Sequence, residues 1–237
     1  MNTIRVMNAK SKMIAHRGLS GIEKENTAAA FIAACNRSYY GVETDVHVTS
    51  DGYYVIYHDD STNGALPHDI SIEKCTLSEI KELQLMNTFG IRSDLRIPEL
   101  YEYIQILRTY EKQAILELKN QMTKESIVGI IEVIAKENYL EHTTFISFSW
   151  ENLVTIRSIL PEASIQYLCK DISPDIVPKL QQYHFDIDIK HKALTRRKVL
   201  SLHLKGIKIN AWTVDDKRSA HKLISYGVDY ITTNILE

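Results

Sequence analysis

The chain has 237 residues, of which 44% are hydrophobic, and its 28 basic and 30 acidic residues give a formal net charge of −2. This length and apolar content suffice for one large domain, or two small ones, with a substantial core. The near balance of charge excludes the broad basic field that sequence-independent nucleic-acid binding requires, so we expect no nucleic-acid partner.

The cysteines indicate a reducing compartment, and the lack of long apolar runs indicates a chain that is neither secreted nor inserted in a membrane. The three cysteines are widely separated and form no C-x-x-C pair, so neither a disulfide framework nor a structural zinc site is indicated. No segment approaches the roughly 20 apolar residues of a membrane span, and the first residues contain no apolar run of signal-peptide length. We therefore expect a cytoplasmic protein without stable membrane insertion, and the sequence leaves its oligomeric state open.

Short apolar, β-branched runs alternate with amphipathic segments along the whole chain. Eight runs are predicted as strands, at residues 13–16, 41–48, 114–119, 144–148, 164–168, 185–189, 207–214 and 229–232. Helices are predicted to begin near residues that cap or open helices, namely Asn26-Thr27, Thr76 with Glu79, Pro98, Thr123, Ser149, Pro174, Thr195 and Asp215.

This alternation favours an α/β protein of the closed (β/α)₈ TIM barrel class. An open doubly wound sheet would alternate in the same way, but no glycine-rich nucleotide loop follows an early strand. Asp51-Gly52 predicts a hairpin after the second strand, and the turn-rich residues beyond it predict an insertion at about 51–75 over the site. We expect a single domain over residues 1–237 with this small insertion.

The predicted strand at 41–48 carries the most informative pattern in the chain. Glu43, Asp45 and His47 alternate with valine and threonine, so their side chains share one face of the strand. Carboxylates are rarely buried without a partner, because removing water from an unpaired charge costs several kcal/mol, roughly. Together with Glu117 from another strand, Glu43 and Asp45 could hold Mg²⁺ or Ca²⁺, which prefer oxygen ligands.

Basic residues near these acids leave two interpretations open. Arg17 and Lys119 could simply form ion pairs with the carboxylates, or they could supply positive charge for an anionic substrate such as a phosphodiester. His16 and His58 fall at strand ends near the acidic residues, where they could donate and accept protons near neutral pH. A structural role for both histidines stays open on the residues alone. The sequence contains neither the H-E-x-x-H motif of zinc metalloproteases nor the G-x-S-x-G motif of serine hydrolases, so neither of these hydrolase classes is indicated.

Ordered motifs over the length of the chain resemble those of the glycerophosphodiester phosphodiesterase family. The motifs are I-A-H-R-G from Ile14, E-N-T-A-A-A-F from Glu25, G-V-E-T-D-V-H-V-T-S-D-G from Gly41, V-I-Y-H-D from Val55, T-L-S-E-I-K-E-L from Thr76, I-P-E-L from Ile97, L-E-L-K from Leu116, I-S-F-S from Ile146, A-W-T-V-D from Ala211 and G-V-D-Y-I-T-T-N from Gly227. The resemblance implies a (β/α)₈ barrel with a small inserted subdomain. It also implies metal-dependent hydrolysis of glycerophosphodiesters to sn-glycerol 3-phosphate and an alcohol.

The resemblance further implies a role for each matching residue. The implied metal ligands are Glu43, Asp45 and Glu117, and the general acid/base pair is His16 and His58. The implied phosphate contacts are Arg17 and Lys119, with Glu25 and Asn26 beside the catalytic histidine and Trp212 as an aromatic wall at the glycerol side.

The chain departs from the family pattern in three places. Lys24 replaces a common proline before E-N-T, the stretch after His58-Asp59 is shorter and lacks the usual arginine-threonine pair, and the terminal T-T-N-I-L-E lacks a common proline. The shortened stretch puts substrate preference in doubt. Two alternatives therefore remain: a phospholipase D-like enzyme acting on lysophospholipids, and a catalytically silent barrel that binds phosphorylated ligands.

Overall fold

Eight parallel strands close into a barrel in the computed structural model, which describes residues 2–7, 10–62, 69–87, 90–92 and 94–237. Each strand pairs with its neighbours, and pairing between the first two closes the ring. In chain order the barrel strands are β1 (Lys12–Ala15), β2 (Gly41–Val48), β6 (Gln113–Leu118), β7 (Thr143–Ser147), β8 (Ser164–Cys169), β9 (Asp186–Lys190), β10 (Ile209–Trp212) and β11 (Tyr230–Thr233). All eight predicted strands are confirmed, with ends that shift by no more than two residues.

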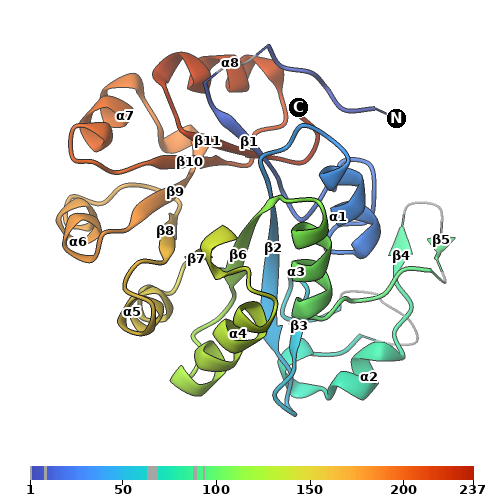
Figure 1. Cartoon of the computed structure of the whole chain (residues 1–237). Coiled ribbons are helices and arrows are strands. Elements are labelled where there is room, and N and C mark those ends of the chain that lie inside the picture. Colours follow the sequence, from blue (N-terminus) through green and yellow to red (C-terminus); the bar gives the residue numbers. More distant parts are fainter. Residues whose placement is uncertain (1, 8–9, 63–68, 88–89, 93) are drawn as a thin grey trace.

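Helices surround the strands as an outer layer (Figure 1). They are α1 (Ala28–Cys35), α3 (Leu100–Thr109), α4 (Lys124–Lys136), α5 (Trp150–Ile159), α6 (Ile176–Tyr183), α7 (Arg196–His203) and α8 (Lys217–Tyr226), with single 3₁₀ turns η2 (Leu140–His142) and η3 (His191–Ala193). Thr27, Thr123, Ser149 and Thr195 cap their helices as predicted, each side chain accepting a backbone N–H. Within the described ranges no helix is long and apolar enough to cross a membrane.

An additional segment separates β2 from α3 and lies to one side of the barrel (Figure 1). It contains β3 (Tyr54–Ile56), η1 (Ile72–Lys74), α2 (Leu77–Lys81), β4 (Met86–Asn87) and β5 (Gly90–Ile91). β3 returns antiparallel to β2 through a turn at Gly52, whose φ of 84° favours glycine. The segment has its own apolar cluster, which includes Val55, Ile72 and Ile80. The predicted insertion at about 51–75 lies within it, and residues 63–68 lie outside the described part of the chain.

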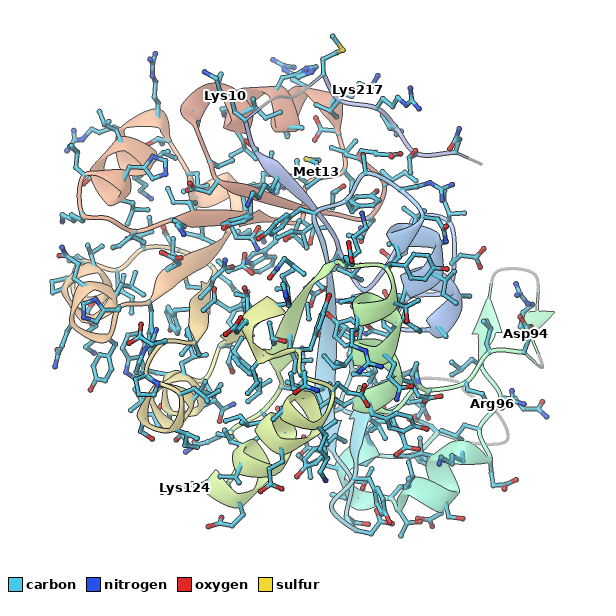
Figure 2. The ribbon with its side chains drawn as sticks, viewed as in Figure 1. Lys10, Met13, Asp94, Arg96, Lys124 and Lys217 are labelled. Atoms are coloured by element: carbon cyan, nitrogen blue, oxygen red, sulfur yellow. The ribbon has the colours of Figure 1, made fainter. Side chains whose placement is uncertain are left out.

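Alternation along the strands divides the barrel into a packed outer face and a mixed interior. Side chains on the outer face of the strands pack against the helices and form the main hydrophobic core. Met13 of β1 is one of these side chains and lies within the molecule in Figure 2, whereas Lys124 and Lys217 lie at its periphery. Ile14, Ile115, Ile146 and Leu168 form an apolar cluster inside the barrel. Polar interior side chains join different strands. Thr232 Oγ1 of β11 donates to Asn210 Oδ1 of the neighbouring β10 at 3.0 Å, and Asn210 Nδ2 donates to Gln166 Oε1 of β8, beyond β9, at 3.3 Å.

Tyr103 ties α3 to the strand that carries the acidic residues. Its side chain is fully buried, and its hydroxyl donates to the backbone oxygen of Val42 in β2 at 2.7 Å. Its ring meets Phe31 of α1 edge-on, with 5.0 Å between centroids. One side chain therefore joins two helices to β2.

Replacing Tyr103 by phenylalanine should lower the free energy of unfolding by about 1–2 kcal/mol, because the Val42 carbonyl loses a buried donor. The matched control is Tyr101→Phe on the same helix, whose side chain is 41% exposed. Urea unfolding should show almost no change for the control. Equal losses in the two variants would contradict a role for the buried hydroxyl.

Candidate active site

Three carboxylates meet where β2 and β6 lie side by side. Glu43 and Asp45 project from the interior face of β2, and Glu117 pairs in register with Asp45 across the parallel ladder. All three are buried, and each offers an oxygen that lies within 4.8 Å of the others. The predicted acidic cluster is therefore present in space.

The same carboxylates also form the ion pairs that the sequence left as an alternative. Lys119 Nζ lies 3.0 Å from Glu117 and 3.4 Å from Asp45, and Arg17 Nε lies 3.5 Å from Asp45. Arg17 is shared with Glu25, whose two carboxylate oxygens each accept from Nη1 at 3.1 Å. Four carboxylates thus face two cations in this part of the described structure.

This surplus of negative charge appears in the pKa values of the cluster. Burial, and then repulsion from Asp45, raise the pKa of Glu117 to about 7, and the same two causes raise the pKa of Glu43 well above its usual range. Asp45 behaves differently. Although burial opposes its ionisation, Lys119 and Arg17 lower the pKa of Asp45.

These residues fit a divalent cation. Asp45 Oδ1 is buried and accepts no hydrogen bond among the described residues, its cationic neighbour being Lys119 Nζ at 3.4 Å, while Asn26 Nδ2 donates to Oδ2 at 2.8 Å. A set of three carboxylates is the ligand chemistry that hard cations prefer, and a bound cation would offset the surplus charge. The cluster is therefore compatible with a divalent cation and does not by itself distinguish one hard cation from another.

The loop after β1 adopts strained backbone to reach this cluster. Arg17 and Asn26 have φ angles of 54° and 53°, in the left-handed region that favours glycine. This turn directs the backbone N–H of Arg17 to Glu43 Oε2 at 2.9 Å, and Asn26 N–H donates to the Arg17 carbonyl at 3.0 Å. At Gly18, with φ of 77°, a Cβ atom would lie 2.7 Å from Ala30. The H-R-G sequence thus has a steric reason as well as a chemical one.

His16 and His58 approach the cluster from different segments. His16 follows β1, with Nε2 at 3.9 Å from Glu43 and Nδ1 at 2.8 Å from Asn234 Oδ1. Burial, and then the neighbouring Arg17, lower the pKa of His16. His58 follows β3, and its Nδ1 lies 2.5 Å from Asp59 Oδ1.

His47 shares the β2 face with Glu43 and Asp45 but is directed to the additional segment. Its Nδ1 lies 2.9 Å from Glu73 Oε1, and its Nε2 lies 3.4 Å from the backbone oxygen of His58. His47 is fully buried, so it supports the segment that carries His58.

One pocket collects the side chains from these strands. The residues that line it are His16, Arg17, Glu43, His58, Glu117, Ile146, Phe148, Leu168, Asp188, Trp212, Thr213 and Thr232. Trp212 meets Phe148 edge-on with ring centroids 5.9 Å apart, and its Nε1 has no hydrogen-bond partner within the described ranges. The remaining predicted site residues are not among those that line the pocket, but each contacts a lining residue or another of the four; they are Asp45, Glu25, Asn26 and Lys119.

Three residues of the site were missed by the sequence analysis. Asp188 lines the pocket from β9, and Asn234 and Asp215 form a hydrogen-bonded chain to His16. The alternation in D-I-D-I-K at 186–190 is the same signal that identified β2, and it could have identified Asp188. Asn234 lies in the T-T-N motif, but nothing in its spacing predicts a contact with a residue more than 200 positions away.

Comparisons with known proteins agree with this geometry. Residues 16–237 match the family model described as the glycerophosphoryl diester phosphodiesterase family. A glycerophosphodiester phosphodiesterase from Caldanaerobacter subterraneus is 29% identical over 95% of this chain and 94% of the relative. An Oleispira antarctica phosphodiesterase, solved in complex with the product sn-glycerol-3-phosphate, has a TM-score of 0.85 and 28% identity over 95% of this chain and 93% of that one. A Parabacteroides distasonis glycerophosphodiester phosphodiesterase has a TM-score of 0.82 and 27% identity over 96% of this chain and 94% of that one.

Barrel, acidic cluster and pocket together define a TIM-barrel hydrolase of phosphoric diesters. Because the family model covers nearly the whole length, the chain belongs to the glycerophosphoryl diester phosphodiesterase family. The resemblance stated from the motifs is confirmed, as is the fold that it implied.

The buried carboxyl group of Asp188 should make the free energy of unfolding depend on pH. Burial, and then Glu117, raise the pKa of Asp188 well above 3.8, and its Oδ1 has no hydrogen-bond partner in the described structure. The folded chain therefore holds this proton more tightly than the unfolded chain, so the free energy of unfolding falls as pH rises above the unfolded pKa. The fall is at most about 1.4 kcal/mol per pH unit and ends at the folded pKa.

The near-isosteric Asp188→Asn variant should lack this dependence. Urea unfolding without divalent cation, between about pH 4 and about pH 7, should show the variant gaining stability relative to the wild type as pH rises. A difference that stays constant, or that moves in the other direction, would contradict a neutral, buried Asp188.

Proposed function

We propose that this chain hydrolyses glycerophosphodiesters to sn-glycerol 3-phosphate and an alcohol, in a reaction that depends on Mg²⁺ or Ca²⁺. The observation that carries the proposal is a buried three-carboxylate cluster, two members of which, Glu43 and Glu117, line the same pocket as His16 and His58. The product named for the Oleispira antarctica structure supports the substrate class.

In this proposal Glu43, Asp45 and Glu117 hold the cation. When bound, the cation supplies positive charge toward a phosphate oxygen and a glycerol hydroxyl, where negative charge develops. The donor set supports this assignment, because the three acids are buried and their charge exceeds that of the neighbouring cations.

Basic side chains position the phosphate in this proposal. Arg17 offers a planar fork of N–H donors and Lys119 a point charge. Glu25 orients Arg17 through two contacts at 3.1 Å, and Asn26 orients Asp45 through one contact at 2.8 Å. Trp212 provides an aromatic wall of the pocket, which suits the glycerol part of the substrate.

Proton transfer is assigned to the two histidines. One imidazole accepts the proton of the attacking hydroxyl as its oxygen bonds to phosphorus, and the other protonates the alkoxide as its bond to phosphorus breaks. Their positions support this pairing, because both line one pocket, His16 from the end of β1 and His58 from the end of β3. The nucleophile is either water, which gives sn-glycerol 3-phosphate directly, or the glycerol 2-hydroxyl, which gives a cyclic phosphate that water then opens.

Purified chain should convert glycerophosphocholine to sn-glycerol 3-phosphate in the presence of Mg²⁺ or Ca²⁺, and a chelator should abolish the reaction. A coupled assay for sn-glycerol 3-phosphate measures it directly. Lysophosphatidylcholine is the comparison substrate, because a phospholipase D-like enzyme would prefer it. Full activity after exhaustive chelation would contradict the metal, and binding without turnover would favour a silent barrel.

His16→Ala and His58→Ala should each lower kcat by about 10²-fold to 10⁴-fold, the usual loss of a general acid or base. Circular dichroism should show an unchanged fold. His221→Ala, exposed on α8, is the matched control and should keep wild-type kcat. If either pocket variant kept wild-type turnover, its histidine would have no part in proton transfer.

A further inference from the structure

The hydrogen-bond partners of His16 determine which of its nitrogens carries the proton. Nδ1 lies 2.8 Å from Asn234 Oδ1, and a contact between an imidazole and an amide can run in either direction. The direction depends on the tautomer of the ring and on the orientation of the amide. A third group must therefore decide between the two arrangements.

Asp215 is that third group. Its Oδ1 accepts the backbone N–H of Asn234 at 2.8 Å and the hydroxyl of Thr233 at 3.1 Å. Its Oδ2 lies 2.7 Å from the side-chain amide of Asn234. An ionised carboxylate only accepts hydrogen bonds, so the amide group that faces it must be the NH₂. The carbonyl oxygen of Asn234 then has to face His16.

This orientation leaves a single arrangement for the ring. A carbonyl oxygen has no proton to give, so His16 Nδ1 must be the donor. Ser20 Oγ, 2.7 Å from the same oxygen and 2.8 Å from the His16 carbonyl, braces the junction. In the neutral ring Nε2 then carries the lone pair, and it is the nitrogen nearest the acidic cluster, 3.9 Å from Glu43.

We propose that Asn234 and Asp215 are positioning residues that hold His16 in its Nδ1–H tautomer, so that Nε2 accepts the proton of the attacking hydroxyl. The Nδ1–H tautomer follows from the hydrogen bonds among Asp215, Asn234 and His16 alone. The role of Nε2 as proton acceptor rests on the proposed function. The proton moves from the hydroxyl to Nε2 while the oxygen–phosphorus bond forms, and the departing alkoxide takes its proton from His58.

Exchanging the Asn234 amide and the Asp215 carboxylate tests whether these two residues set the position of the His16 proton. In Asp215→Asn, the new amide keeps an oxygen for the Asn234 backbone N–H and turns its NH₂ toward the Asn234 side chain. The Asn234 amide then rotates, presents its NH₂ to His16 and moves the ring proton to Nε2. In the double variant Asp215→Asn with Asn234→Asp, a carboxylate oxygen again accepts from Nδ1–H.

Long-range ¹H–¹⁵N spectra of histidine-labelled full-length chain report the tautomer without any assay of activity. The His16 signals are assigned by their loss in a His16→Gln variant. We expect Nδ1–H in the wild type, Nε2–H in Asp215→Asn and Nδ1–H again in the double variant. Asp216→Asn is the matched control, because asparagine also caps a helix and the α8 N-cap needs only a side-chain oxygen.

Kinetics with glycerophosphocholine should follow the spectra. Asp215→Asn should lose on the order of 10²-fold in kcat with KM little changed, and the double variant should recover most of that loss. A wild-type His16 proton on Nε2, or an Asp215→Asn variant that keeps both Nδ1–H and wild-type kcat, would overturn the positioning role. An inactive wild-type chain would instead contradict the proposed function, so the two proposals fail separately.

Discussion

Uncompensated negative charge, buried between β2 and β6, is the constraint around which the rest of the site is arranged. Glu43, Asp45 and Glu117 are brought together by the pairing of two strands, and strand pairing leaves them little freedom to separate. Arg17 and Lys119 offset part of the charge, while burial, and then repulsion from Asp45, raise the pKa of Glu43 and of Glu117. A divalent cation is the chemistry that completes such a cluster.

The surrounding structure keeps these groups in place. The left-handed backbone at Arg17 and Asn26 is held because both residues contact the carboxylates directly, through a backbone N–H and an amide side chain. Inside the barrel, hydrogen bonds link Thr232, which lines the pocket, to Asn210 and Asn210 to Gln166. Helices pack on the outer face of the strands, so the strained residues Arg17 and Asn26 are attached to a well-packed barrel.

Much of this site could be predicted from period-two alternation and from the order of strands. Glu43 and Asp45 share a face because they are two residues apart, and Glu117 reaches them because β2 and β6 become neighbours despite the long segment between them. His47 shows the limit of that reasoning, since it lies on the same face yet points to Glu73 in the additional segment. Asn234 and Asp215 show another limit, because barrel closure brings the end of the chain to His16 and no local pattern records that contact.

Calorimetric titration of Mg²⁺ and Ca²⁺ into the metal-free chain would show whether the buried carboxylates bind a cation. We expect a single binding site that is lost in Glu43→Gln and Glu117→Gln and kept in Glu132→Gln, a change at an exposed position of α4. Absence of binding to the wild type, or equal binding by all four proteins, would contradict the claim that the buried carboxylates form a cation site.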